Sequence, residues 1–318
     1  MRAYVTGGTG FVGSNIVKVF VDRHGVDVVC PVNRFVPDDP TYAVEPLDLL
    51  DSEAVRASVR NAQPDVIVHS MILNDFARLY ADRRLAWDSY VGTTETLADV
   101  ANEVGAKLIL VSTDWVFDGT QSRADETAPP NPINYYGVLK MASEQVAMTR
   151  SDRAAVARVS GVNGVHWARP TTEREQDCGF GYFVLSLVDA LSEGRTFTVW
   201  EGDDINMVAT PSLASQCGEL IHRMATIDGA TGVFHCCGAD ATGRMELALA
   251  ACAAFDLDPG LLTTGPADPD SMPGSPIPYD TSLGVDRTES ILGVAPLTTD
   301  DLLARFRLEL ESGALAPV

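Results

Sequence analysis

The sequence has no long hydrophobic run and few basic residues, and each of these absences excludes a class of protein. No stretch approaches the roughly 18 consecutive apolar residues that a membrane-spanning helix needs. Lysine and arginine number 23 against 44 aspartates and glutamates, a formal net charge of −21, which argues against nucleic acid or an anionic membrane surface as a partner. An anionic ligand therefore has to be held by local donors, such as backbone amides or placed arginines.

Cysteine motifs, metal-ligand spacings and a leader segment are lacking as well. The six cysteines form no Cys-x-x-Cys pair, so in a chain of 318 residues we expect buried, reduced thiols. The histidines show no metal-ligand spacing, and no metal site is predicted. The chain opens on a strand-like segment instead of a basic and apolar signal, so the expected location is cytoplasmic.

What is present is organised around the segment Met1–Gly13. A predicted strand at Ala3–Val5 is followed by a helical segment at Phe11–Arg23, and glycines spaced three apart lie between and within them. Amides at a helix N-terminus point outward, and the helix dipole favours a pyrophosphate there. A plain structural turn is the alternative, but the strand-to-helix context favours a dinucleotide site. Its predicted residues are Gly7, Thr9, Gly10, Phe11, Val12 and Gly13.

The end of the second predicted strand, Val26–Cys30, indicates which dinucleotide binds. An acidic residue at this strand end would bind the ribose 2′-hydroxyl of NAD, but the sequence has Asn33 and Arg34. A guanidinium suits a 2′-phosphate by charge and by its fork geometry, so we predict a preference for NADP(H), with NAD(H) possible. The alternative is that Arg34 is merely solvated. Asp48 and Leu49 are expected on the adenine side.

Strands and helices alternate along the first half, which predicts an α/β fold with a doubly wound parallel sheet, a Rossmann fold. The segment Lys107–Val111 is almost wholly apolar, as in a central strand covered on both faces. Beyond Ser160 the alternation loosens, which predicts a smaller C-terminal substrate lobe. We assign residues 1–160 to a dinucleotide-binding domain that about 197–238 rejoin, and residues 161–196 and 239–318 to the lobe. The Pro- and Gly-rich segment 259–278 is expected to be an ordered loop.

Tyr136 and Lys140 are candidate catalytic residues. They lie four apart on a helix predicted from Asn134 to Arg150, so their side chains share a face, whereas the spacing of Tyr135 turns it away. A neighbouring ammonium and a nicotinamide cation would both lower the pKa of a tyrosine from near 10. Tyr136 could then act as the general acid for a carbonyl. On its own, the Tyr-x-x-x-Lys spacing is more typical of a solvated helix face. The glycine loop that precedes it in the sequence favours the catalytic interpretation instead.

The loop after the central strand, Ser112–Gly119, offers the other candidates. Thr113 is the hydroxyl best placed to orient a substrate oxygen, with Ser112 as its competitor, and Asp114 is either a second polar contact or a cap of the loop. Candidates for a substrate diphosphate are Arg158, Arg169 and Arg195, although ordinary surface pairing explains each of them equally well.

These marks together resemble the extended short-chain dehydrogenases/reductases. The resemblance rests on the Gly7-x-x-Gly10-x-x-Gly13 loop, on the hydroxyl residue that ends the fifth strand and on Tyr136-x-x-x-Lys140. The run Ser-Thr-Asp-Trp-Val-Phe-Asp-Gly at 112–119 is similar to a signature of the dTDP-4-dehydrorhamnose reductase branch. The resemblance implies Thr113, Tyr136 and Lys140 as the catalytic set, with the last two also contacting the cofactor. It implies reduction of a keto group on a nucleotide-linked deoxysugar.

The sequence departs from that family at several positions. The branch usually has Tyr where this chain has Trp115, a predicted substrate contact, and Asn where it has Ser89. The nicotinamide wall, commonly Asn-Ala-Ala, reads His69-Ser70-Met71. The family's members often dimerise, which implies a homodimer through the helices predicted at 83–104 and 134–150.

Two other functions stay open. A nucleotide-sugar epimerase or dehydratase would retain its NAD, but dehydratases typically have an acidic pair where Asp114 stands alone. A non-catalytic NADP-binding regulatory subunit, like the related methionine adenosyltransferase accessory chain, would bind cofactor without turnover.

Overall fold

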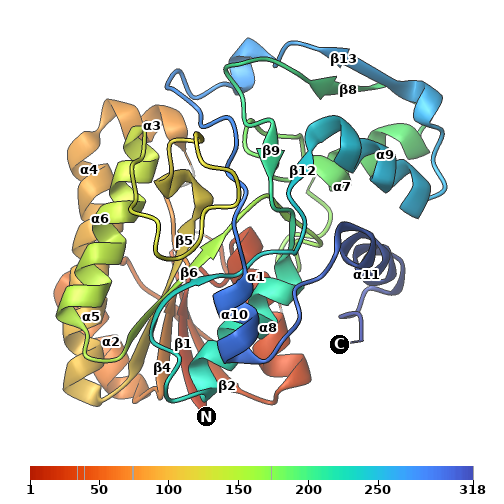
Figure 1. Cartoon of the computed structure of the whole chain (residues 1–318). Coiled ribbons are helices and arrows are strands. Elements are labelled where there is room, and N and C mark those ends of the chain that lie inside the picture. The colour runs from red at the N-terminus through yellow and green to blue at the C-terminus, as the bar shows by residue number, and fades with distance from the viewer. Residues whose placement is uncertain (34, 39, 74, 173, 318) are drawn as a thin grey trace.

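The computed structural model describes residues 1–33, 35–38, 40–73, 75–172 and 174–317. Its centre is a seven-stranded sheet in the order β11-β6-β5-β4-β1-β2-β3, in which every neighbouring pair is parallel (Figure 1). The predicted doubly wound sheet is confirmed. Its strands are β1 (Arg2–Thr6), β2 (Asp27–Val32), β3 (Ala43–Pro46), β4 (Val66–His69), β5 (Lys107–Thr113), β6 (Ala154–Val159) and β11 (Gly232–His235).

Helices cover both faces of the sheet because successive strand residues point to opposite sides. Ala3 and Val5 of β1 pack with one set of helices, and Tyr4 packs with the other. The first set contains α1 (Phe11–Lys18), continued by η1 (Val19–Arg23), with α8 (Ala214–Thr226) and α10 (Asp286–Leu292). The second contains α2 (Ser52–Ala62), α3 (Phe76–Ala81), α4 (Arg83–Trp87), η2 (Asp88–Gly92), α5 (Thr93–Val104) and α6 (Tyr135–Arg150).

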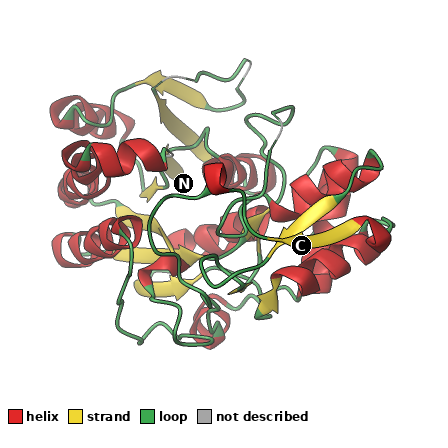
Figure 2. Cartoon of the chain, turned by 90° about the horizontal axis from the view of Figure 1, so that it is seen from above, coloured by secondary structure: helices red, strands yellow, loops and turns green. Residues whose placement is uncertain are grey.

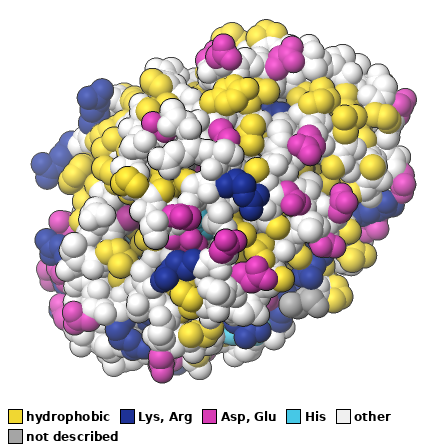
Figure 3. All heavy atoms as spheres, in the orientation of Figure 1, with side chains coloured by type: hydrophobic (Ala, Val, Ile, Leu, Met, Phe, Trp, Pro, Cys, Tyr) yellow, Lys and Arg dark blue, Asp and Glu magenta, His cyan; other side chains and the backbone are white. Residues whose placement is uncertain are grey.

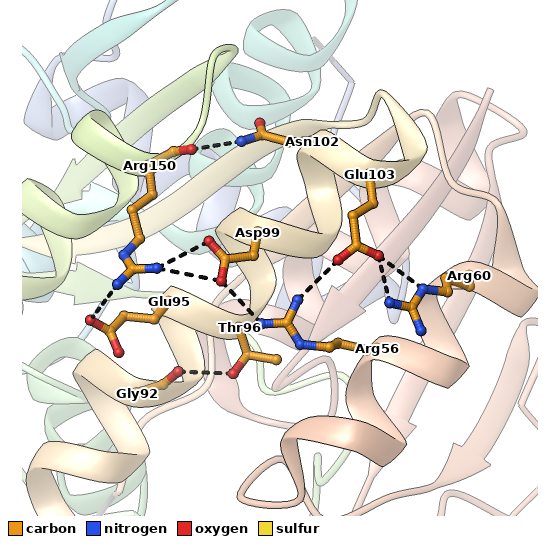
Figure 4. A network of polar contacts seen from close by, with 9 residues as sticks. All are labelled: Arg56, Arg60, Gly92, Glu95, Thr96, Asp99, Asn102, Glu103 and Arg150. Carbon is orange, nitrogen blue, oxygen red and sulfur yellow. Dashed lines mark hydrogen bonds and ion pairs between the residues drawn. The ribbon is translucent and has the colours of Figure 1, made fainter.

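A network of ion pairs holds α5 between α2 and α6 (Figure 4). Arg56 of α2 contacts Asp99 and Glu103 of α5, at 3.0 and 3.1 Å. From the other side, Arg150 of α6 contacts Glu95 and Asp99. Each exposed pair contributes little on its own, but together they fix the relative positions of the helices. The helix that carries the catalytic candidates, α6, is therefore joined to α5 by these pairs.

The smaller lobe has a core of its own, in which Phe183, Leu187, Leu247 and Phe306 are fully buried. Its helices and strands lie above the carboxyl ends of the sheet, and Figure 2 shows them from above. They are α7 (Phe183–Ser192), β8 (Phe197–Trp200), α9 (Arg244–Ala254), β13 (Leu262–Gly265) and α11 (Thr299–Ser312). Short pairs join β7 (Val162–Asn163) to β10 (Ser212–Leu213) and β9 (Val208–Ala209) to β12 (Thr242–Gly243).

The segment expected to be a loop at 259–278 contains a strand. Residues 262–265 form β13, which pairs in parallel with β8 outside the main sheet. Pairing between distant segments cannot be deduced from local Pro and Gly content, so this strand was not predicted from the sequence. The chain rejoins the main sheet through α8 and β11.

The surface and the thiols agree with an ordinary globular chain. On the face shown in Figure 3, acidic and basic side chains are interspersed among uncharged ones. All six cysteines are buried and free, as expected. Within the ranges that the structure describes, no helix combines the length and the apolar character needed to cross a membrane.

Candidate functional site

The glycine turn lies where the strand order reverses. From β1 the chain builds β2 and β3 on one side, and β4 starts the other side, so the carboxyl ends of β1 and β4 flank a crevice. Gly7 has a φ of +70°, and a Cβ there would lie 2.6 Å from the Met71 backbone nitrogen. A Cβ on Gly13 would lie 2.1 Å from the Gly7 carbonyl oxygen. Close backbone approach therefore requires glycine at both positions.

The N-terminus of α1 fits a dinucleotide pyrophosphate. Its N-cap residue is Gly10, so no side chain caps the amides of the first turn. The turn is held by the Gly10 N–H, which donates to the Gly7 carbonyl at 2.8 Å. Uncapped amides and the dipole of the helix favour a negative group here. Thr9, Phe11 and Val12 are half-buried around this turn.

Replacing Gly13 with alanine is expected to abolish tight NADP(H) binding, because the added methyl group collides with the Gly7 carbonyl oxygen. The measurement is a fluorescence titration with NADPH, where we expect a rise in Kd of at least about 100-fold. Gly92→Ala is the matched control, because its nearest heavy atom would be Asp88 Cβ at 3.9 Å. An unchanged Kd in Gly13→Ala, with Gly92→Ala also normal, would contradict the assigned turn.

The residues predicted for the adenosine side are only partly described. Asn33 is exposed, and Arg34 lies outside the described residues. Asp48 is exposed and accepts a hydrogen bond from the Leu50 N–H at 3.1 Å, and Leu49 is half-buried. The guanidinium of Arg169 lies 4.3 Å from the ring centroid of Phe35, which follows β2. Arg169 therefore lies on the adenosine side, and its predicted substrate contact remains a prediction.

The end of β4 forms a neutral polar wall beside the glycine turn. His69 is buried, and its Nδ1 lies 2.7 Å from Thr6 Oγ1. Burial, with a smaller effect of the Lys140 charge, lowers the pKa of His69 to about 3. The imidazole is therefore uncharged at neutral pH. Ser70 Oγ donates to the Thr6 carbonyl at 2.7 Å, which fixes the chain just before Met71.

Tyr136 lies in an aromatic environment at the start of α6. Asn134 caps the helix by accepting the Gly137 N–H at 2.8 Å. The Tyr136 ring centroid lies 5.6 Å from that of Phe76 and 6.0 Å from that of Trp115. Burial raises the pKa of the phenol, and a hydrogen bond with Thr113 opposes this effect.

The expected lowering of the Tyr136 pKa by Lys140 is not seen in the chain alone. Lys140 is almost fully buried, and its ammonium donates to the Val111 carbonyl at 3.0 Å. Its Nζ lies 5.4 Å from the ring centroid of Tyr90. Desolvation lowers the pKa of Lys140 to about 8, although the Glu144 charge opposes the shift. The two side chains share a face of α6, as predicted, but burial decides the protonation of each.

The pKa of Lys140 predicts how stability depends on pH. The folded-state pKa of about 8 lies below the ordinary value of 10.5, so between these values the unfolded chain binds more protons and stability rises with pH. The free energy of unfolding of the wild type minus that of Lys140→Met should therefore increase by about 2–3 kcal/mol from pH 7.5 to pH 10. Urea denaturation of both proteins at each pH measures it, and a flat difference would contradict a depressed pKa.

The structure distinguishes the two hydroxyls at the end of β5. Ser112 Oγ donates to Glu144, on the side away from Tyr136, whereas Thr113 faces the phenol. Thr113 Oγ1 donates to Asp114 Oδ1 at 2.9 Å and accepts the Trp115 N–H at 3.2 Å. Thr113 is therefore the hydroxyl at the site. Its hydroxyl is positioned by these two contacts, with Asp114 and with the Trp115 N–H.

Asp114 holds the loop and is not open to a ligand. Besides Thr113, its carboxylate accepts hydrogen bonds from Ser160 Oγ at 2.7 Å and from Thr281 Oγ1 at 2.5 Å. Burial raises its pKa to about 6, although these hydrogen bonds oppose the shift. Of the two roles considered for Asp114, the contacts support the loop cap, because β5, β6 and the segment around Thr281 are joined through this carboxylate.

The Trp115 side chain contacts the smaller lobe. Trp115 is buried, and a Cβ on Gly179 would lie 2.9 Å from its ring, so the lobe packs directly on this indole. Sequence reasoning missed Gly179 and Phe76, because neither lies near a recognisable motif.

Arg158 is wrong as a candidate for a substrate diphosphate, since it is buried in an ion pair with Glu144 at 2.7 Å. Arg195 pairs with Glu193 at the surface.

The glycine turn lies between β1 and α1, and Thr113, Tyr136 and Lys140 lie at the same edge of the parallel sheet. This arrangement is that of an NAD(P)-dependent oxidoreductase of the short-chain dehydrogenase/reductase type. Residues 1–296 match the family model described as RmlD substrate binding domain. The chain belongs to this family, which confirms the resemblance to dTDP-4-dehydrorhamnose reductases.

Individual relatives are similar over most of the chain. Methionine adenosyltransferase 2 subunit beta of Xenopus tropicalis is 28% identical over 290 residues, covering 91% of this chain and 82% of that protein. The dTDP-4-keto-6-deoxy-D-glucose reductase of Streptomyces niveus is 28% identical over 274 residues, covering 84% and 83%. A hypothetical dTDP-4-dehydrorhamnose reductase from Sulfolobus tokodaii has a solved structure with a TM-score of 0.75 at 25% identity, covering 95% and 99%. The dTDP-4-dehydrorhamnose reductase of Bacillus anthracis, solved in complex with NADP, shares the fold with a TM-score of 0.76 at 20% identity, covering 97% and 98%.

Proposed function

We propose that this protein is an NADPH-dependent carbonyl reductase that acts on the keto group of a nucleotide-linked deoxysugar. The observation that carries the proposal is the position of Tyr136, whose phenol faces Thr113 of β5 while Lys140 donates to the Val111 carbonyl of the same strand. The glycine turn after β1, which β4 separates from β5, fits the cofactor pyrophosphate. The sugar-nucleotide reductases among the relatives support the substrate class.

Each residue has a distinct part in the proposed reaction. A bound nicotinamide cofactor supplies the hydride. Tyr136 donates its phenolic proton to the carbonyl oxygen, and its raised pKa keeps that proton in place until the oxygen becomes basic. Thr113 faces the phenol and would orient the substrate oxygen beside it. Lys140 would hold the nicotinamide ribose and stabilise the phenolate that proton transfer leaves behind.

The preference for NADP(H) rests on the adenosine side. The sequence after β2 offers Asn33 and Arg34 in place of an acid, and Arg169 brings a second guanidinium next to Phe35. Two guanidinium groups suit a 2′-phosphate, whereas a free 2′-hydroxyl gives them nothing to pair with. Arg169→Gln should therefore weaken NADPH binding about tenfold more than NADH binding. Equal losses for both cofactors would contradict this role for Arg169.

The function is tested by NADPH and NADH oxidation against a panel of nucleotide-linked 4-keto-6-deoxysugars. The proposal predicts consumption of NADPH with at least one sugar of the panel. Net conversion of a sugar without consumption of added cofactor would instead indicate an epimerase that retains NAD. The engaged carboxylate of Asp114 argues against dehydration, because it leaves no free acid next to Thr113.

A regulatory subunit is the second candidate, and a specific observation favours it. Tyr136 is packed among the rings of Phe76, Tyr90 and Trp115, and the Lys140 charge is not among the effects that set the pKa of its phenol. Several relatives are subunits beta of methionine adenosyltransferase 2. This reading predicts NADP(H) binding without carbonyl turnover and a partner enzyme that copurifies with the chain.

A homodimer is expected through α4–η2–α5 and α6. On these helices the large apolar side chains of Trp87 and Met148 are 44% and 38% exposed and are available for such a contact. Light scattering on the purified chain should give twice the mass of 34.0 kDa, and Trp87→Arg should shift it toward the single-chain value. A single-chain mass for the wild type at working concentration would contradict the dimer.

A further inference from the structure

A cavity of about 300 Å³ lies away from the candidate active site, between α8, α11 and residues 293–297. In Figure 1 these helices lie near the C-terminal end of the chain, on the side of the sheet opposite α5 and α6. The volume is at the lower end of the range for small-molecule sites. Apolar side chains, among them Leu213 and Leu297, form part of the wall, and the rest is polar.

One of the residues that line the cavity has a side-chain amide without hydrogen-bond partners. Gln216 in the first turn of α8 is 6% exposed, and neither its amide nitrogen nor its amide oxygen has a partner among the described residues. A buried amide that lacks both partners is costly, of the order of 1–3 kcal/mol per group. An oxygen acceptor inside the cavity would satisfy the amide nitrogen, and a hydroxyl group on the same ligand would satisfy the amide oxygen.

The same end of α8 favours a negative charge. The N-cap position is occupied by Leu213, so no side chain caps the first turn, and the positive end of the helix dipole faces this region. Gln216 and the uncapped turn are independent observations that point to the same place. They indicate a ligand that carries both a charge and hydrogen-bonding oxygens.

Three guanidinium groups line the cavity, although the chain has only 23 basic residues against 44 acidic ones. Arg23 is paired with Glu219. Arg223 and Arg305, by contrast, have no hydrogen bond or ion pair with any residue in the described part of the chain. Glu309, which also lines the cavity, is 1% exposed; burial raises its pKa, and the charges of Arg23 and Arg305 are among the effects that oppose this shift. The lining thus holds three arginines against two glutamates, Glu219 and Glu309.

We propose that this cavity binds a small molecule through an oxyanion group, a phosphate or a carboxylate, that pairs with Arg305 and Arg223 and hydrogen-bonds Gln216. Guanidinium forks match both groups in geometry. The site is separate from the glycine turn, and it does not depend on the proposed reductase function.

The test is isothermal titration of the full chain with inorganic phosphate and with succinate, at constant ionic strength and with sodium chloride as the dilution control. We expect one of the two anions to bind, and the anion that binds distinguishes a phosphate site from a carboxylate site. Arg305→Gln and Gln216→Leu should each weaken binding at least tenfold. Arg307→Gln is the matched control on α11, since Arg307 pairs with Asp256 and Glu311 and does not line the cavity.

Thermal melting of the same variants keeps the proposal testable if the heat signal is weak. Without anion, Gln216→Leu should melt at or above the wild-type temperature because it removes an unpaired buried amide. Added anion should raise the melting temperature of the wild type and of Arg307→Gln, but not that of Gln216→Leu or Arg305→Gln. Binding that is equal in all four proteins, or no binding of either anion, would overturn the proposal.

Discussion

Replacing Tyr136 with phenylalanine is expected to lower the rate of carbonyl reduction by a factor of about 10²–10⁴, the usual contribution of a general acid. The phenylalanine ring keeps the packing against Phe76 and Trp115, so the fold and the cofactor site should be retained. The change removes only the proton donor. Single-turnover reduction and an NADPH titration, performed on the same preparation, separate the loss of chemistry from a loss of binding.

Tyr135 provides the matched control for this substitution. Its hydroxyl donates to the Arg83 carbonyl at 3.0 Å, on the other side of the helix from Lys140. Tyr135→Phe should therefore keep at least about half of the wild-type rate, since it removes one exposed hydrogen bond outside the site. Similar losses in both variants would show that the helix end, and not the Tyr136 proton, limits the rate.

Replacing Glu144 with alanine is expected to lower the free energy of unfolding by about 3–5 kcal/mol. Glu144 of α6 accepts from Arg158 Nη2 at 2.7 Å and from its Nε at 3.0 Å, and both side chains are almost fully buried. Without the carboxylate, the guanidinium of Arg158 stays buried with its charge unpaired, and Ser112 loses its acceptor. Urea denaturation measures the effect as a shift of the midpoint.

Two further variants show whether the unpaired charge is the cause. Glu103→Ala removes a partner of Arg56 and Arg60 at the surface and should cost less than about 1 kcal/mol. The double variant Glu144→Leu with Arg158→Met should regain most of the stability, because it removes both buried charges together. A loss below about 1 kcal/mol in Glu144→Ala would contradict the account of this pair.

Much of the sheet could be predicted from the sequence because its signals are local. The strand-to-glycine-to-helix order at the N-terminus and the apolar run at 107–111 each depend on neighbouring residues alone, and both appear as predicted. Gly105 ends α5 with a φ of +73°, as a glycine at a helix end commonly does. The family model over residues 1–296 confirms the resemblance that these motifs carried.

Contacts between distant segments could not be predicted in the same way. In the sequence, nothing distinguishes Arg158 from an arginine that binds phosphate. Its ion pair with Glu144 forms only when β6 packs against α6. The choice between Ser112 and Thr113 depended on which face of β5 lies toward the phenol, and the sequence alone does not fix the orientation of a strand. The strand β13 depends on β8, which pairs with it from 65 residues earlier in the chain (Phe197 with Leu262), and the Pro- and Gly-rich composition around β13 concealed the pairing.

The central claim is that this chain reduces a sugar carbonyl with a nicotinamide cofactor, and hydride transfer tests it most directly. The wild type and Tyr136→Phe are incubated with NADPH that carries deuterium at the transferred position and with nucleotide-linked 4-keto-6-deoxysugars, and the sugar is analysed by mass spectrometry. The account predicts a product that carries one deuterium at the reduced carbon with the wild type, and at most a trace of it with Tyr136→Phe. Tight NADPH binding without any deuterium in the sugar would contradict the reductase and favour the regulatory subunit.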